Sequence, residues 1–385
     1  MLLIHRVMAI VGLTGLLFAA GYAVLNVLAM LVWGRRRPLA PCAPAPVTLL
    51  KPLCGAEPGL YEHLRSFCRQ DYGQYQIIFG VRDPGDPACA VVERLMAEFP
   101  SLPMDLVVNP QLHGSNFKVS NLINMIALAR HDVLAMADSD AWVRPDYLTC
   151  VTAPLSTQNV GLVTCVYHGV PTDNVWSRLG AMYINEWYMP SVLLAWMFGH
   201  QGYVSGQTVS LRRETLDAIG GLRAVANDLA DDYRLGELVR GLGLEVVLSS
   251  YLVEGEHHEP RLASLTSHET RWMSTIRVLR PHSFRWMFLT FSLPLACAAL
   301  LLAAAAGPLP AVAGVLFWTT ATARLTLHFL HRLRCRRPVL SDLWLLPARD
   351  VLLCWVWCRS FFTSRVTWRG GEFDVKADGV MRHLS

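Results

Sequence analysis

The chain has 385 residues, and its 34 Lys+Arg against 30 Asp+Glu leave a formal net charge of only +4. Charged residues make up 17% and apolar residues 53%, whereas soluble domains usually have roughly 25% charged residues. This composition excludes a disordered protein, which needs low hydrophobicity and high net charge. So small a net charge also argues against a stripe of basic side chains that would follow the phosphates of a nucleic acid. The sequence therefore predicts a globular body with a membrane attachment and no nucleic-acid partner.

The first expected element is an apolar helix from Ile10 to Trp33, followed by three arginines at 35–37 and by Pro38. About 20 apolar residues at 1.5 Å rise cross a hydrocarbon core of roughly 30 Å. A signal peptide is the alternative, but it carries its stronger basic cluster before the apolar run. Because the basic cluster follows the apolar run here, the sequence predicts that residues 1–34 are a retained membrane anchor. By the positive-inside rule, the chain that follows starts in the cytoplasm.

Residues 35–282 are enough for one α/β domain with a full core. Within them, strand-like apolar runs alternate with helix-like segments. The expected strands are 47–53, 75–81, 104–108 and 133–137, and the expected helices are 60–69, 91–99, 119–130 and 231–239. This alternation predicts a mostly parallel sheet flanked by helices. Ligands of such sheets bind beyond the carboxyl ends of the strands, so we expect the chemistry there.

Acidic residues stand at or near several such positions: Asp83 after the second strand, Asp138 and Asp140 after the fourth, and Asp232 at a helix start. Taken singly, an Asp after a strand is most often a loop or cap residue. Asp138 and Asp140 are less easily explained as loop or cap residues, because their period-two spacing places both carboxylates on one side of an extended chain. Such a pair repels unless a cation lies between its members. Mg²⁺ or Mn²⁺, which keep waters and take phosphate oxygens, are the predicted ions.

The last region, residues 283–385, contains apolar runs at 286–306 and 311–330, separated by a turn with Gly307 and Pro308. They predict two crossings, and the arginines after them are again read as cytoplasmic. Arg324 interrupts the second run and would need to snorkel or pair. A final apolar stretch, 351–362, is either another crossing or a helix at the surface. The shorter run 187–198 is either core or a helix in the interface.

Several motifs together resemble a known family. Asp83 in the segment 81–87, the Asp138-Ser139-Asp140 motif, Asp232, and the Arg271-Trp272 pair resemble family 2-type inverting glycosyltransferases with the GT-A fold. The anchor before the body and the apolar segments after it are similar to the ceramide glucosyltransferase branch, family 21. Segments 49–57, 113–116 and 118–124 look like bacterial hopanoid-biosynthesis glycosyltransferases, which put N-acetylglucosamine on bacteriohopanetetrol.

The resemblance implies a role for each candidate residue. Asp232 would be the general base, and Asp140 with Asp138 would ligate the metal. His268, Arg271 and Trp272 would bind the diphosphate or wall the acceptor site, although the family usually has Gln or Arg where this chain has His268. The implied donor-binding residues are Lys51, Pro52, Asp83, Lys118, Asn121 and Asp138.

Several of these residues also have a simpler structural explanation. Lys118 at a helix start could be solvated surface, and an Arg-Trp pair near a membrane is a common interfacial anchor. His257 and His258 invite a metal reading, but adjacent residues of a strand face opposite sides, which favours a loop.

The function implied is inverting transfer of a sugar, N-acetylglucosamine from UDP-N-acetylglucosamine, to a lipid hydroxyl of bacteriohopanetetrol. Two alternative transferases stay open: a ceramide glucosyltransferase using UDP-glucose, and a processive polysaccharide synthase, which would need more crossings than three or four. A non-catalytic membrane scaffold or lipid carrier and a metal-dependent phosphodiesterase are further alternatives. The expected location is the inner (cytoplasmic) membrane, multi-pass, with the catalytic domain facing the cytoplasm. The expected partners are a UDP-sugar, a membrane lipid acceptor and the bilayer.

Overall fold

The computed structural model describes residues 2–36, 45–172, 174–200, 202–363, 365–368, 371–375 and 381–383, the last three ranges by their backbone alone. The chain forms two compact units, each drawn from separate stretches of sequence. The helical unit comprises 1–35, 171–199 and 259–366, and the sheet unit comprises 36–170, 200–258 and 367–385. The expected division into consecutive segments 1–34, 35–282 and 283–385 stays a prediction.

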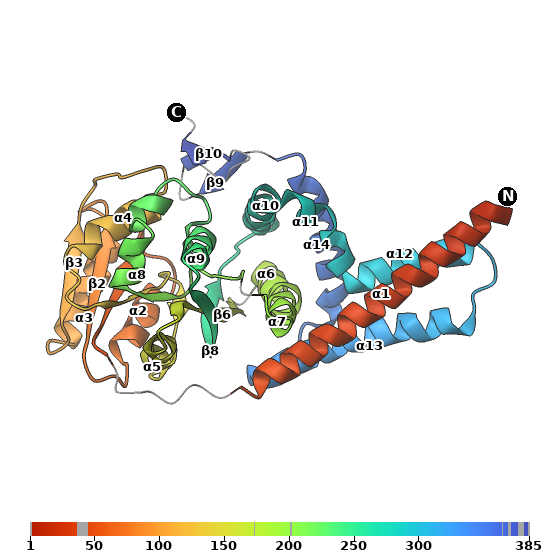
Figure 1. Cartoon of the computed structure of the whole chain (residues 1–385), viewed down its shortest axis with the longest axis horizontal. Coiled ribbons are helices and arrows are strands. Elements are labelled where there is room, and N and C mark those ends of the chain that lie inside the picture. Colours follow the sequence, from red (N-terminus) through yellow and green to blue (C-terminus); the bar gives the residue numbers. More distant parts are fainter. Residues whose placement is uncertain are drawn as a thin grey trace. The chain divides into compact units, whose positions relative to one another are not determined.

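The sheet unit is built on eight strands in the order β3-β2-β1-β4-β7-β6-β8-β5 (Figure 1). Their bounds are β1 Val47–Pro52, β2 Tyr75–Val81, β3 Met104–Val108, β4 Val133–Met136, β5 Ala141–Trp142, β6 Val160–Pro171, β7 Val209–Arg212 and β8 Glu245–His257. The first four strands pair in parallel. β7 pairs antiparallel with β4 and with β6, and β5 pairs antiparallel with β8. All four predicted strands are present, and the predicted parallel pairing is confirmed for that half of a mixed sheet.

Burial on both faces explains why β1, β2 and β4 are mostly apolar, since every residue of these strands is buried. Side chains alternate along a strand, so Leu49 and Phe79 join one apolar core, while Leu50 and Ile78 join the core on the opposite face. The covering helices include all four that the sequence predicted. The helices of this unit are α2 Leu60–Cys68, α3 Ala88–Glu98, α4 Phe117–Ile126, α5 Tyr147–Thr152, α8 Arg213–Ala218 and α9 Asp231–Gly241.

The helical unit begins with α1, Leu2–Gly34, whose 33 residues have a mean hydropathy of 2.1 in their most apolar window. Among the described residues it is the one helix long and apolar enough to cross a membrane. The other helices are α6 Val175–Tyr183, the π-helix η2 Ile184–Tyr188, α7 Met189–Met197, α10 Leu262–Leu279, α11 Pro281–Arg285, α12 Ser292–Ala305, α13 Ala311–Arg334 and α14 Leu346–Ser360.

The predicted apolar segment 286–306 is not one helix. A short 3₁₀ turn occupies Met287–Thr290, and α12 starts only at Ser292. Its 14 residues span about 21 Å, which is less than the roughly 30 Å of a hydrocarbon core. The segment 311–330 does lie within a single helix, α13. Residues 351–360 of the last apolar stretch lie in α14.

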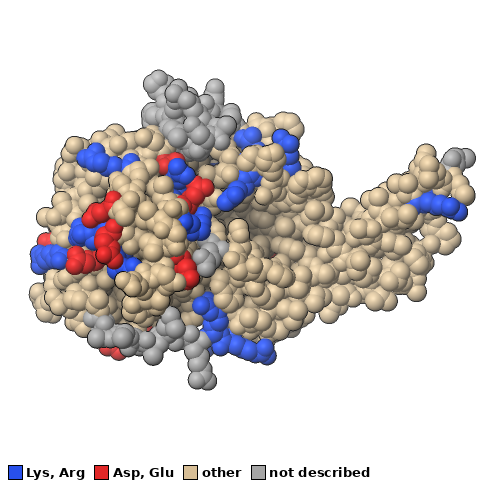
Figure 2. Space-filling model, in the orientation of Figure 1, with Lys and Arg blue, Asp and Glu red and all other residues tan. Residues whose placement is uncertain are grey.

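Helices α1, α12 and α13 lie side by side as a long bundle (Figure 1). Small residues allow the close approach, because a methyl group on Gly12 would stand 2.7 Å from the carbonyl oxygen of Ala299. On the face that Figure 2 shows, charged side chains gather over the sheet unit and appear on the bundle only near its ends. The exception inside is Arg324, which is buried and, as predicted, paired: its guanidinium bonds Glu186 at 2.6 Å and Asp350 at 3.2 Å.

Candidate active site

Four carboxylates of the sheet unit come from two distant stretches of sequence: Asp138 and Asp140 follow β4, and Asp231 and Asp232 open α9. We refer to these four residues as the acidic cluster. Because β7 is antiparallel to β4 and places Val209 opposite Met136, the turn before β7 also lies at this end of the sheet.

Lys118 binds both halves of the acidic cluster. Its ammonium nitrogen lies 2.6 Å from Oδ1 of Asp138 and 3.8 Å from Oδ2 of Asp231. Burial alone would lower the pKa of Lys118, but the charges of Asp138, Asp231 and Asp232 outweigh it and hold the pKa above its ordinary value. Lys118 is therefore a fixed cation within the cluster, and the solvated-surface reading of it is wrong.

Asp232 has the environment of a base. Its Oδ2 accepts a hydrogen bond from the backbone N–H of Gly206 at 2.7 Å, and its Oδ1 accepts one from Tyr233 at 2.7 Å. Desolvation, helped by the negative charge of Asp231, raises the pKa of Asp232 to about 6. A carboxylate with a pKa in this range is ionised at neutral pH yet basic enough to accept a proton in a reaction. A methyl group on Gly206 would lie 2.9 Å from both Asp138 Oδ2 and the Lys118 ammonium, so a larger residue there would displace these side chains.

Asp140 carries the features of a cation ligand. Its Oδ1 accepts a bond from the Gln207 side-chain amide at 3.1 Å, and desolvation together with the charge of Asp138 raises its pKa. The amide oxygen of Gln207 is buried and unpartnered within the described part of the chain. Across those same residues, no group of three or more His, Cys, Asp and Glu converges as a complete metal site. Two carboxylates suit Mg²⁺ or Mn²⁺ held mainly by waters and substrate phosphates.

Lys51 and Pro52 end β1 beside the cluster. Lys51 is fully buried, donates to the backbone oxygen of Asp138, and lies 3.8 Å from the ring centroid of Phe67. Burial lowers the pKa of Lys51 to about 7 against the opposing charges of Asp138 and Asp140. Its contacts hold the chain that carries Asp138, and its donor-binding role stays a prediction.

Asp83 lies at the expected strand end but is exposed, and its carboxylate accepts a bond from the backbone of Gly85 at 2.8 Å. Sequence reasoning missed Asp86, whose carboxylate accepts bonds from the N–H of Gly55 at 2.9 Å and of Ala88 at 2.8 Å. Asp86 thereby ties the loop after β1 to the loop after β2. Its position just before α3 was the available signal.

The motifs 113–116 and 118–124, which lie at and after the start of α4, make hydrogen bonds to neighbouring parts of the chain. Asn121 is buried and donates to the backbone oxygen of Gly80 at 2.7 Å; its donor-binding role stays a prediction. Asn116 caps α4 by accepting from Val119, and it donates to the backbone of Asp228 at 2.8 Å and to Asp231 Oδ1 at 3.2 Å. The motif 113–116 therefore fixes the loop that leads into α9, a role that the sequence did not reveal.

His268, Arg271 and Trp272 lie on α10 of the helical unit, not in the sheet unit that carries the acidic cluster. Nδ1 of His268 lies 2.8 Å from Oε1 of the buried Glu259. The Trp272 ring packs against His268 at 4.1 Å and against Tyr183 at 5.4 Å between centroids. Glu259 and Tyr183 thus orient two of the three predicted residues, and neither carried a sequence motif.

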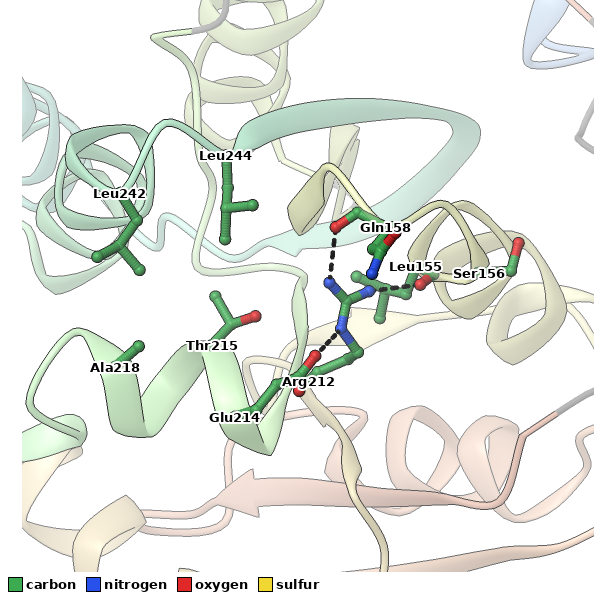
Figure 3. Close-up of a pocket in the computed structure, with 9 residues that line it drawn as sticks. All are labelled: Leu155, Ser156, Gln158, Arg212, Glu214, Thr215, Ala218, Leu242 and Leu244. Atoms are coloured by element: carbon green, nitrogen blue, oxygen red, sulfur yellow. Dashed lines mark hydrogen bonds and ion pairs between the residues drawn. The ribbon is translucent and has the colours of Figure 1, made fainter.

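A cavity of about 630 Å³ lies elsewhere in the sheet unit (Figure 3). Arg212, which lines it, sits opposite Val133 at the start of β4, whereas the acidic cluster follows the end of that strand. The guanidinium of Arg212 is held by Glu214 and by the backbone oxygens of Leu155 and Gln158. The cavity therefore does not belong to the acidic cluster.

Comparison with known proteins identifies a family and several partial relatives. The model of glycosyl transferase family 21 matches residues 12–381. Ceramide glucosyltransferase 3 of Caenorhabditis elegans is 24% identical over 237 residues, which are 61% of this chain and 51% of that protein. Ceramide glucosyltransferase of Candida albicans is 30% identical over 114 residues, 26% of this chain and 21% of its own. The chain thus spans about half or less of the length of these curated relatives.

Among solved structures, a mannosyltransferase of Pyrobaculum calidifontis in complex with GDP-Man and Mn²⁺ matches with a TM-score of 0.56 at 20% identity. The match covers 92% of this chain and 99% of that one. This likeness supports the predicted GT-A-type fold. With the family model matched over nearly the whole sequence, the chain belongs to glycosyl transferase family 21.

Proposed function

We propose that the chain is a metal-dependent inverting glycosyltransferase that moves a sugar from a UDP-sugar to a hydroxyl of a membrane lipid. The observation that carries the proposal is the convergence of Asp138, Asp231 and Asp232 around Lys118 in a family 21 chain. Carboxylates, a fixed ammonium and a base with a raised pKa are the groups that this reaction requires.

In the proposed reaction, Asp232 accepts the proton of the acceptor hydroxyl as that oxygen attacks the anomeric carbon. A new bond forms between this carbon and the acceptor oxygen, while the bond from the same carbon to the diphosphate oxygen breaks and UDP leaves with its electron pair. One base and a single displacement invert the configuration, so an α-linked donor gives a β-glycoside. Lys118 supplies a positive charge that suits the phosphate groups.

Asp138 and Asp140 would hold Mg²⁺ or Mn²⁺, because two half-buried carboxylates at one strand end suit an ion whose other ligands are waters and substrate phosphates. Such an ion, when bound, stabilises negative charge on the leaving diphosphate. We further propose that Lys51, Pro52, Asp83 and Asn121 contribute to donor binding. His268, Arg271 and Trp272 are proposed for the diphosphate and acceptor.

We propose N-acetylglucosamine as the sugar and bacteriohopanetetrol as the acceptor, on the likeness of segments 49–57, 113–116 and 118–124. The names of the curated relatives favour the alternative of ceramide as acceptor with UDP-glucose as donor. Either lipid keeps its apolar part in a bilayer and offers hydroxyls at the surface. We therefore propose an inner-membrane enzyme with α1 and the α12–α13 hairpin in the membrane and the sheet unit in the cytoplasm.

The test incubates the full chain in nanodiscs with labelled UDP-N-acetylglucosamine or UDP-glucose and with bacteriohopanetetrol or ceramide. Labelled glycolipid is expected with one pair, and Asp232→Asn should lower transfer by about 10²–10⁴-fold while UDP still binds. The matched control is Asp132→Asn, whose carboxylate lies before β4 and is 96% exposed; it should transfer normally. Transfer that survives in Asp232→Asn contradicts the assignment of the base. UDP-sugar hydrolysis without glycolipid contradicts the transferase proposal.

A further inference from the structure

One surface of the helical unit carries large apolar side chains that the rest of the chain leaves uncovered. Trp355 of α14 is 46% exposed, and Phe362, just beyond α14, is 91% exposed. Trp286 lies between α11 and the 3₁₀ turn that follows it and is 65% exposed. The aromatic patch, as we call this surface, comprises Arg285, Trp286, Val351, Trp355, Arg359 and Phe362.

Contacts between aromatic rings join the two parts of the aromatic patch. The indole N–H of Trp357 on α14 donates to the backbone oxygen of Phe284 on α11 at 3.0 Å. The ring centroid of Trp357 lies 5.7 Å from that of Phe288, which lies 6.2 Å from that of Trp286. Trp357 also lies 6.1 Å from Phe291, the residue that precedes α12. Helices α11 and α14 therefore form one surface beside the start of α12 (Figure 1).

The polarity of α14 is the reverse of that of a surface helix in a soluble domain. Its exposed residues are those at positions 347, 348, 351, 355, 358 and 359. They recur every three to four residues, and only Arg359 among them is charged. Its buried residues include Arg349, which bonds Glu269 of α10 at 2.6 and 2.8 Å, and Asp350, which bonds Arg324 of α13 at 3.2 Å. A helix of a soluble domain turns its charges outward and its apolar stripe inward, so the arrangement of α14 indicates an apolar partner outside.

The side chains of the aromatic patch are those that concentrate where a bilayer meets water. Tryptophan gathers at that boundary, and basic side chains there attract anionic head groups. The guanidinium of Arg359 lies 5.2 Å from the ring centroid of Trp355, and Arg285 directly precedes Trp286 in the chain. The patch thus presents positive charge beside apolar rings. A layer of anionic phospholipid matches both features, because its head groups are negative and its acyl chains are apolar.

The spacing of charges along α14 determines how the helix meets such a layer. Only eight residues separate Asp350 from Arg359, which is about 12 Å of helix. A hydrocarbon core is roughly 30 Å thick, so α14 does not cross it. A helix with one apolar face lies in the plane of the interface instead. In contrast, α12 starts beside the patch and carries no charged side chain, as expected of a helix that enters the core.

We propose that α14 is an interfacial helix and that the aromatic patch binds the cytoplasmic leaflet of a bilayer at the level of its head groups. Trp355 and Phe362 contact acyl chains, and Arg285 and Arg359 bind anionic head groups. The proposal rests on the membrane location given in the proposed function, and it adds a lipid-binding surface that the transfer reaction does not use. Because the Arg349–Glu269 pair joins α14 to α10, the same surface holds α10 at a constant height relative to the bilayer.

The test measures contact with lipid by fluorescence quenching and needs no transfer activity. The full chain is placed in nanodiscs, one chain per disc, with phospholipids brominated either near the head group or near the end of the acyl chains. Comparison of wild type with Trp355→Phe isolates the fluorescence of Trp355 among the 12 tryptophans. The shallow bromines should quench it about twofold more strongly than the deep ones, because an interfacial helix lies only about 5–10 Å into the layer.

Two other exposed tryptophans provide matched controls through the same exchange to phenylalanine. Trp318 on α13 lies within a proposed crossing, and its fluorescence should be quenched more by the deep bromines. Trp142 belongs to the sheet unit, and neither lipid should quench it. A further comparison uses brominated phosphatidylglycerol and brominated phosphatidylcholine at equal mole fraction. The anionic lipid should quench Trp355 more strongly, and Arg359→Gln should reduce that difference.

Each contrary result identifies what is wrong. Quenching of Trp355 no stronger than that of Trp142 overturns the proposal, and stronger quenching by the deep bromines overturns it in favour of a crossing helix. Quenching that disappears when each disc holds two chains assigns the patch to a second copy. If Trp318 is quenched and Trp355 is not, only the interfacial helix is refuted; if both escape quenching, the proposed membrane location fails as well. Equal quenching by the two head-group types refutes the role of Arg359.

Discussion

Asp232 shows how the position of one side chain sets its chemistry. Its neighbours in the cluster, Asp231 and Lys118, act in opposite directions on its pKa, and desolvation tips the balance upward to about 6. A raised pKa of this kind means that the folded chain binds a proton more tightly at Asp232 than the unfolded chain does. The contribution of Asp232 to the free energy of unfolding is therefore present at low pH and is lost as the pH rises through about 6. Activity and stability are thus expected to respond to pH in opposite directions.

The first prediction is a transfer rate that falls below about pH 6, because protonated Asp232 cannot accept the proton of the acceptor. The measurement is kcat/KM against pH for the full chain in nanodiscs. Far-ultraviolet circular dichroism at each pH serves as the control for folding. A rate that stays constant from pH 7 to pH 5 would show that Asp232 is not the base.

The second prediction concerns the metal. Because the proposed metal site has only two carboxylates, Asp138 and Asp140, the ion should bind tightly only when a diphosphate supplies further oxygens. Mn²⁺ with UDP should raise the thermal midpoint of the chain, and Mn²⁺ alone should raise it little. EDTA should abolish transfer, and added Mn²⁺ should restore it. An equal stabilisation of Asp140→Asn by Mn²⁺ with UDP would contradict the assignment.

At the scale of elements, the contact between α4 and α9 joins the two halves of the cluster. Asn116 is fully buried there and bonds both the start of its own helix and Asp231. Gly114 packs so closely that a methyl group would stand 2.3 Å from the Ala226 backbone oxygen. Lys118 and Asp232 therefore hold their places through the segment 113–116.

The third prediction is that Asn116→Asp damages this contact. Aspartate still caps α4, but the two donated bonds are lost and a carboxylate meets Asp231. Unfolding free energy should fall by about 1–3 kcal/mol, and the acid limb of the rate profile should move above pH 6. The control is Asn174→Asp, which makes the same exchange at the cap of α6. An unchanged acid limb would show that Asn116 has a purely structural role.

The fourth prediction compares two glycines of α1. Alanine at position 12 would clash with the backbone of α12 at 2.7–2.8 Å, whereas alanine at position 21 would meet nothing within 4 Å among the described atoms. Gly21→Ala should be neutral or stabilising by up to about 1 kcal/mol through helix propensity. Gly12→Ala should lower the thermal midpoint measured in detergent. Equal midpoints would show that α1 and α12 do not pack as described.

Sequence patterns predicted the elements whose signal is local. The apolar runs at 47–53 and 133–137 became strands, and Asp138 and Asp140 follow the second of them. Asp232 opens α9 instead of ending a strand, and the charge of Lys118 acts on both Asp138 and Asp232. Gly206 and Gln207 were missed, since only the antiparallel return of β7 brings them to Asp138 and Asp140. The break near Trp286 was missed because hydropathy does not separate interfacial aromatic residues from a crossing helix.

At the scale of the whole molecule, both units are assembled from interrupted stretches of chain. Residues that face each other in the bundle are far apart in sequence: Leu16 and Ala19 of α1 share a core with Ala296 and Ala313. Arg324 likewise finds Glu186 from the middle of the chain and Asp350 from near its end. Because these partners are so distant in sequence, the sequence indicated that Arg324 needs a counter-charge but did not identify which residues supply it.

This arrangement has a consequence for biosynthesis. Helix α1 is translated before α12 and α13, so its small-residue face stays uncovered by them until both helices have been made. During that interval Gly12 and Leu16 lack their partner helices, so α1 is exposed to mispairing with helices of other proteins.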